Sequence, residues 1–110
     1  MDYRFLGNSG LQISTLTMGT MTFGGTSGVF KHVGNTDVEQ AKKIISMCLE
    51  AGINIFDTAD VYSDGQSEEI LGTALTPEQR KKTLIATKVF GKMGPELHDA
   101  GLSRLHIIRA

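Results

Sequence analysis

The sequence predicts an α/β fold with parallel strands. From residue 16 onward, short β-prone runs alternate with helical segments, and the run at residues 53–57 is mostly apolar, as in a strand buried on both faces. A strand–helix–strand order implies parallel strands joined by right-handed crossovers. A doubly wound open sheet and a (β/α)8 barrel both fit this order, and periodicity alone does not choose between them.

The first 35 residues predict strands and a long loop. Residues 3–6 and 12–16 flank the turn sequence GNSG, which indicates a β-hairpin. Residues 16–20 form a further short strand. The glycine-rich loop at 22–35 is long for a connection between a strand and a helix, and such loops are typically functional or mobile. Its residues Gly24, Gly25 and Gly28 fit either a substrate-side loop or ordinary turns.

Helices and strands then alternate. Thr36 and Glu39 predict a capping box, apolar residues recur at helical spacing up to residue 49, and Gly52 ends this helix. After the strand at 53–57, a second helix begins at Ser67 with acidic residues in its first turn, and Pro77 begins a further short turn. Residues 83–89 form the last strand, and Ser103 caps the last helix.

Three polar side chains lie at or just beyond strand ends. Asp57 closes the second parallel strand, Tyr62 follows in its loop, and Lys88 closes the third. In parallel α/β folds the carboxyl ends of the strands converge on the active site. An ammonium group lowers the pKa of a neighbouring phenol, and a carboxylate keeps that ammonium charged and oriented. The trio therefore suits a general acid that protonates a carbonyl oxygen while a cofactor supplies hydride.

Each residue of the trio also has a simpler interpretation. Asp57 could satisfy loop amides, Tyr62 could be a packing residue with a wet hydroxyl, and Lys88 could be a solvated lysine. A divalent cation at Asp57, Asp60 and Asp64 is disfavoured because no histidine shares the cluster, so we expect no metal.

Longer motifs identify a family resemblance. The run GINIFDTADVYSDGQSEEILGTAL at residues 52–75 closely resembles the signature of the aldo-keto reductase superfamily. LIATKV at 84–89 and MGTMTFG at 18–24 extend the match over essentially the whole chain. The sequence is most similar to the prokaryotic-type branch that includes voltage-gated potassium channel β-subunits.

The resemblance implies a fold and a chemistry. The family fold is a (β/α)8 TIM barrel with an N-terminal hairpin, so the chain would form the N-terminal part of that barrel. Tyr62 matches the family's proton donor, and Asp57 and Lys88 match its supporting pair. Gly19, Thr20 and Met21 match the strand end that borders the nicotinamide, which Asp57 also approaches. The implied activity is reduction of an aldehyde or ketone with NADPH.

The resemblance also implies what residues 1–110 lack. The family's catalytic histidine at the end of the fourth strand matches no residue, and neither does its phosphate-binding segment. We therefore expect a partial domain, truncated as its last helix begins and inactive alone. A cofactor-binding regulatory subunit of the channel β-subunit type, or a fragment without function, is the alternative. We interpret His32, His98 and His106 as surface residues.

Composition excludes several other classes. The 110 residues carry a net charge of −1, which provides no basic patch for nucleic acid. No apolar run is long enough for a membrane span or a signal core. Cys48 is the only cysteine, so no disulfide forms within the chain, and a cytoplasmic location is expected. Cys48 lies on the apolar stripe of its helix and is expected to be a buried thiol.

Overall fold

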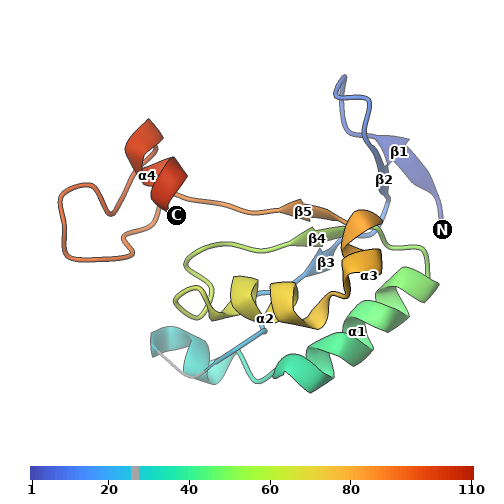
Figure 1. The fold of residues 1–110 in the computed structure, drawn as a ribbon, viewed down its shortest axis with the longest axis horizontal. Coiled ribbons are helices and arrows are strands. Elements are labelled where there is room, and N and C mark those ends of the chain that lie inside the picture. Colours follow the sequence, from blue (N-terminus) through green and yellow to red (C-terminus); the bar gives the residue numbers. More distant parts are fainter. Residues whose placement is uncertain (26–27) are drawn as a thin grey trace.

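The computed structural model describes residues 1–25 and 28–110. Figure 1 shows an α/β arrangement in which strands lie side by side and helices cover one face. The elements in chain order are β1 (Tyr3–Phe5), β2 (Gln12–Ser14), β3 (Met18–Gly19), the 3₁₀ helix η1 (Gly28–His32), α1 (Val38–Glu50), β4 (Ile55–Asp57), α2 (Gln66–Ala74), α3 (Pro77–Lys81), β5 (Leu84–Ala86) and α4 (Arg104–Arg109).

The strands form two sheets. β1 and β2 pair antiparallel as the predicted hairpin, while β3, β4 and β5 form a three-stranded parallel sheet in that order. The register places Gly19 beside Asp57 and Asp57 beside Ala86. In Figure 1 the hairpin lies at one end of this sheet, and α4 lies at the other end, beyond β5. The predicted parallel α/β order is confirmed, and these three strands are a sheet rather than a closed barrel.

The core lies between the parallel sheet and its helices. Phe56 of β4 is fully buried against Ile45 of α1 and Leu71 of α2, and Met18 and Ile85 from the flanking strands pack on the same cluster. Because successive strand side chains point to opposite faces, Phe56 faces the helices and Asp57 faces away from them. Cys48 belongs to this core, as predicted, and burial raises the pKa of its thiol.

Two helices begin at residues other than those predicted. Asp37, not Thr36, caps α1, and its capping box partner is Gln40 rather than Glu39. Thr36 is unavailable because its backbone bonds to Thr22 and Gly24, which keeps it extended beside Phe23. α2 begins at Gln66, after the left-handed Gly65, which is one residue before the predicted start at Ser67.

The other predicted helix signals are correct. Gly52 follows α1 with φ +87°, and the acidic residues Glu68 and Glu69 occupy the first turn of α2. Pro77 begins α3, and Ser103 caps α4 through a bond from the amide of His106.

The strands are shorter than predicted. β3 is limited to Met18–Gly19, and β4 starts at Ile55. β5 ends at Ala86, so Lys88 does not close the strand but lies two residues beyond it. The pairing continues irregularly there: the amides of Thr58 and Asp60 donate to the carbonyls of Ala86 and Lys88 at 2.8 and 3.2 Å.

The predicted glycine-rich loop is described only in part, because residues 26 and 27 lie outside the described residues. Gly24 and Gly25 have φ values of +97° and +101°, which favours the turn interpretation of these two glycines. A Cβ at Gly25 would collide with the backbone of Gly34, so the chain segments that contain these two glycines approach each other closely. Among the described residues, no helix has the length and apolar content that crossing a membrane requires.

Candidate active site

The structure brings Asp57, Tyr62 and Lys88 together around one ammonium group. Lys88 Nζ donates to Asp57 Oδ2 at 2.7 Å, to the Thr58 carbonyl at 2.8 Å and to Tyr62 Oη at 3.3 Å. An ammonium group has three donors, so all of them are used. Nζ also lies 4.9 Å from the centre of the Tyr62 ring. Lys88 is therefore held in one orientation between a carboxylate and a phenol.

The charge of Lys88 is stabilised at this position. Partial burial of the ammonium lowers its pKa, but the hydrogen bonds to Asp57 and Tyr62 and the attraction to Asp57 together outweigh burial. The net effect is a pKa raised above the ordinary value of 10.5. The side chains of Lys88 and Asp57 remain 51% and 36% exposed, so both groups are open to a ligand.

The loop that carries Tyr62 has an unusual backbone. Ser63 and Asp64, which follow Tyr62, have φ values of +51° and +55°, and Gly65 continues at +89°. A side chain in the left-handed region carries a conformational cost, and such residues concentrate at functional sites. Buried Ser63 is fixed there by a 3.0 Å bond from the Gly25 amide to its hydroxyl.

The ring of Tyr62 is also supported from the side. Phe30 of η1 packs edge-on against it, with ring centres 6.2 Å apart. The phenol is thus placed by the strained loop, by Phe30 and by Lys88.

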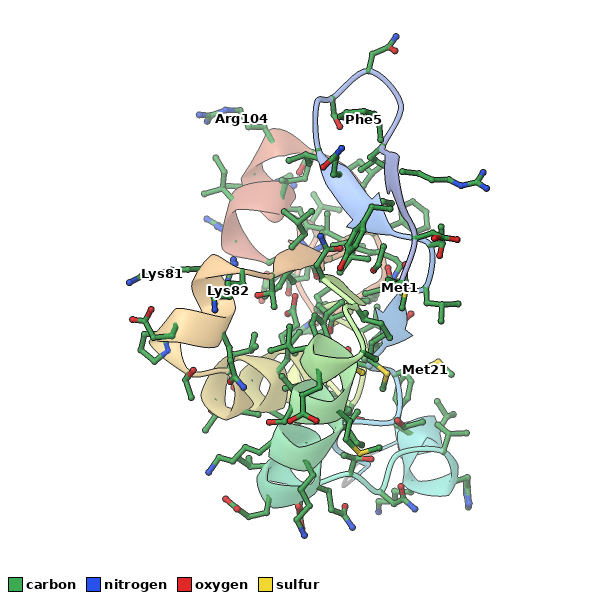
Figure 2. All side chains as sticks on the ribbon, turned by 90° about the vertical axis from the view of Figure 1, so that its right-hand side faces the viewer. Met1, Phe5, Met21, Lys81, Lys82 and Arg104 are labelled. Atoms are coloured by element: carbon green, nitrogen blue, oxygen red, sulfur yellow. The ribbon has the colours of Figure 1, made fainter. Side chains whose placement is uncertain are left out.

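The predicted cofactor-side residues lie at the end of β3. Gly19 is exposed, and nothing lies within 4 Å of where a Cβ would stand. Met21 is also exposed, and Figure 2 shows it on the side of the molecule opposite Lys81 and Lys82. Thr20 differs, because it is fully buried. A ligand at this strand end could contact Gly19 and Met21, whereas the buried Thr20 could only support this strand end from inside the protein.

Sequence reasoning missed two hydroxyl residues that support the site. Thr58 follows Asp57 directly, and Ser67 lies in the first turn of α2; both are buried. Their hydroxyl oxygens are 3.2 Å apart, and Ser67 Oγ also lies 2.9 Å from Thr20 Oγ1. The available signal was a small polar residue on the buried face of a helix, where an apolar residue is expected.

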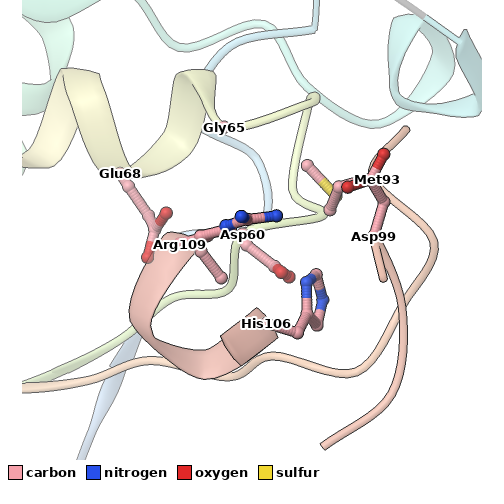
Figure 3. Close-up of a pocket in the computed structure, with 8 residues that line it drawn as sticks. Asp60, Gly65, Glu68, Met93, Asp99, His106 and Arg109 are labelled. Carbon is pink, nitrogen blue, oxygen red and sulfur yellow. The ribbon is translucent and has the colours of Figure 1, made fainter. Parts of the chain in front are cut away.

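A second group of polar residues lines a cavity beside the Tyr62 loop. Asp60 and His106 are 5% and 4% exposed, and Figure 3 shows both side chains turned into this cavity of about 340 Å³. Among the described residues, neither Asp60 carboxylate oxygen nor His106 Nε2 has a hydrogen-bond partner.

His106 corrects one prediction. It is not a surface residue, because the first turn of α4 packs its ring toward Asp60, whereas His32 and His98 are exposed as expected. Asp57, Asp60 and Asp64 do not form a metal cluster, since no three acidic, histidine or cysteine side chains among the described residues are grouped to hold an ion.

The fold and the site define a parallel α/β protein with an oriented lysine–tyrosine pair at the carboxyl ends of its strands. Comparison with known sequences then identifies the family. The model of the aldo/keto reductase family matches residues 15–110, and the chain belongs to this family. Its membership supports an oxidoreductase class, and the resemblance predicted from residues 18–24, 52–75 and 84–89 is confirmed.

Named relatives include potassium channel subunits. The chain is 42% identical over 111 residues to a "Probable voltage-gated potassium channel subunit beta" of Arabidopsis thaliana, covering 98% of this chain and 31% of the relative. A protein of the same name from Oryza sativa subsp. japonica is 41% identical, with the same coverage of 98% and 31%. The chain thus spans about a third of the length of these relatives.

A solved structure shows the same fold. The aldo-keto reductase of Bacillus halodurans, in its holo form, superposes with a TM-score of 0.66 and 37% identity. The superposition covers 87% of this chain and 29% of that one.

Proposed function

We propose that this chain contributes the acid–base centre of an NADP-dependent aldehyde or ketone reductase with a (β/α)8 barrel fold. One observation carries the proposal: all three donors of the Lys88 ammonium are committed, and Tyr62 Oη accepts one of them. No described residue accepts the proton of the Tyr62 hydroxyl, so that proton remains available to a substrate oxygen. The small-molecule carbonyl substrate and the choice of NADP come from the family resemblance.

The proton transfer follows from this arrangement. Tyr62 donates its hydroxyl proton to the carbonyl oxygen as that oxygen gains negative charge. Lys88 stabilises the phenolate that remains, and Asp57 keeps the ammonium charged and in place. When bound, the dinucleotide supplies the hydride that reduces the carbonyl carbon.

The residues of the β3 end fit a flat ring. Gly19 leaves open space above the strand, and the register places it directly beside Asp57. Gly19, Met21 and the partly exposed Asp57 are the residues that would border a nicotinamide at this strand end. We expect residues 1–110 alone to lack turnover, because the family's histidine and phosphate-binding segment match nothing in them.

The proposal is tested by NADPH consumption with an aromatic aldehyde such as 4-nitrobenzaldehyde. The assay uses the complete natural protein that carries this chain. Tyr62→Phe should lower kcat by about 10²–10⁴ while leaving the Kd for NADPH within a fewfold. Tyr3→Phe is the matched control, because Tyr3 donates its hydroxyl to the Gly52 carbonyl far from the site. Full turnover in Tyr62→Phe would refute the proton-donor role.

The names of the relatives favour a second candidate, a cofactor-binding regulatory subunit. In that role the same residues would bind NADPH without rapid turnover. Retained NADPH binding with negligible aldehyde reduction in the natural protein would support it over the enzyme. Loss of both binding and turnover would indicate a chain without an independent function.

A further inference from the structure

Ser67 lies at the centre of a buried network that joins the elements of the site. Its hydroxyl donates to the Thr20 carbonyl at 2.7 Å and lies 2.9 Å from Thr20 Oγ1 and 3.2 Å from Thr58 Oγ1. Its backbone amide donates to the Tyr62 carbonyl at 3.3 Å. Ser67, Thr20 and Thr58 are at most 1% exposed. One small residue of α2 thus contacts the end of β3, the end of β4 and the Tyr62 loop.

Each partner of Ser67 holds a residue of the proposed acid–base centre. Thr20 donates to the Asp57 carbonyl through both its amide, at 2.9 Å, and its hydroxyl, at 3.1 Å. The Thr58 carbonyl receives the Lys88 ammonium at 2.8 Å. The network therefore fixes the backbone of Asp57 and one of the three acceptors that orient Lys88.

The composition of the network indicates a positioning role rather than ordinary packing. Hydroxyl groups cost free energy to bury, and apolar residues of similar size would fill these positions without that cost. Hydrogen bonds fix distance and direction, which apolar contacts do not. The three hydroxyls are buried directly behind the strand ends, and none of them faces the open side where a ligand would bind.

We propose that Ser67 is a positioning residue for the carbonyl-reducing centre. Acting through Thr20 and Thr58, it sets the placement of Asp57 and Lys88 relative to Tyr62 and to the cofactor-side residues Gly19 and Met21. The effect of Ser67 on catalysis rests on the proposed function, whereas its effect on the backbone around Asp57 and Lys88 does not.

The structural consequence is tested by hydrogen–deuterium exchange in the complete natural protein, resolved to single amides. In Ser67→Ala, the Thr20 and Asp60 amides, which donate to Asp57 and Lys88, should exchange at least about tenfold faster. The Ala41 amide, which donates to the Asp37 carbonyl in the first turn of α1, lies outside this network and should change much less. An equal increase at all three amides, or no increase at Thr20 and Asp60, would overturn the proposal.

Ser14→Ala is the matched control. Ser14 is 1% exposed, and its hydroxyl donates to the Leu16 carbonyl and accepts from the Asn54 amide at the opposite end of β4. It should leave the Thr20 and Asp60 amides unchanged relative to Ala41. If Ser67→Ala does not fold, Thr58→Val, which removes the hydroxyl at nearly constant volume, tests the same network by the same exchange ratios.

The catalytic consequence is tested by steady-state kinetics. Ser67→Ala should lower kcat by about 10- to 100-fold and change the KM for the aldehyde less than threefold, because misplaced reacting groups reduce the rate more than binding. Thr58→Val should act similarly, and the double variant should be no slower than the worse single variant. Unchanged kcat in Ser67→Ala would overturn the catalytic claim. If the natural protein shows no turnover, the proposed function fails, while the exchange experiment still decides the role of Ser67.

Discussion

Replacing Lys88 with methionine tests whether this lysine serves catalysis or only stabilises the fold. The substitution removes the 2.7 Å ion pair with Asp57 and the bond to the Thr58 carbonyl. A pair as exposed as this one contributes about 0.2–1 kcal/mol, and the lost bond to the carbonyl adds about 1 kcal/mol. We therefore expect the free energy of unfolding to fall by about 1–2 kcal/mol, while kcat falls by about 10²–10⁴.

Lys42→Met supplies the control. Lys42 forms an ion pair with Glu39, also at 2.7 Å and with a similar lysine exposure of 49%. This pair lies on the surface of α1, so its loss should cost about 0.3–0.5 kcal/mol and leave kcat unchanged. Urea denaturation followed by circular dichroism measures both stabilities. A loss above about 3 kcal/mol in Lys88→Met with normal kcat would refute the functional assignment, because Lys88 would then be a structural residue.

Three further predictions concern the burial of Cys48, the close backbone approach at Gly25 and the pH dependence of the Lys88 ion pair. Cys48 should react with Ellman's reagent about 100-fold more slowly than in urea, since burial blocks access and raises the thiol pKa; equal rates would contradict the core. Gly25→Ala should cost about 2–4 kcal/mol in urea denaturation, against about 1 kcal/mol for Gly7→Ala, because both glycines are left-handed but only Gly25 meets backbone. From neutral pH up to pH 10.5 the stability difference between wild type and Lys88→Met should be full, and it should decline as pH rises further through the raised folded pKa of Lys88; a difference that grows over this alkaline range would contradict the ion pair.

Local patterns predicted most of the fold. The turn between β1 and β2, the helical spacing of α1 and the Thr76–Pro77 start of α3 depend on neighbouring residues, and all three are present. The start of α1 was misplaced because the sequence TDVEQ contains two overlapping capping boxes. Only the bonds from Thr36 to the distant Thr22 and Gly24 decide between them.

The site was predicted unevenly for the same reason. Asp57, Tyr62 and Lys88 follow from their places near strand ends, because parallel strands bring these ends together. Ser67 was expected only as the first residue of its helix, since nothing local shows that its hydroxyl lies within hydrogen-bond distance of Thr20, 47 residues away. The burial of His106 likewise depends on how α4 packs on the Tyr62 loop rather than on its own sequence.

The contacts of the site join residues that lie far apart in the sequence, and this separation affects when the site forms during folding. The contact between Lys88 and Asp57 spans 31 residues and that between Thr20 and Ser67 spans 47, whereas the hairpin and the helices form between near neighbours. Closing long loops is slow because their entropy is lost before the contacts form. We therefore expect the hairpin and the helices to form before the three strand ends meet, and the geometry around the Lys88 ammonium to be completed late in folding.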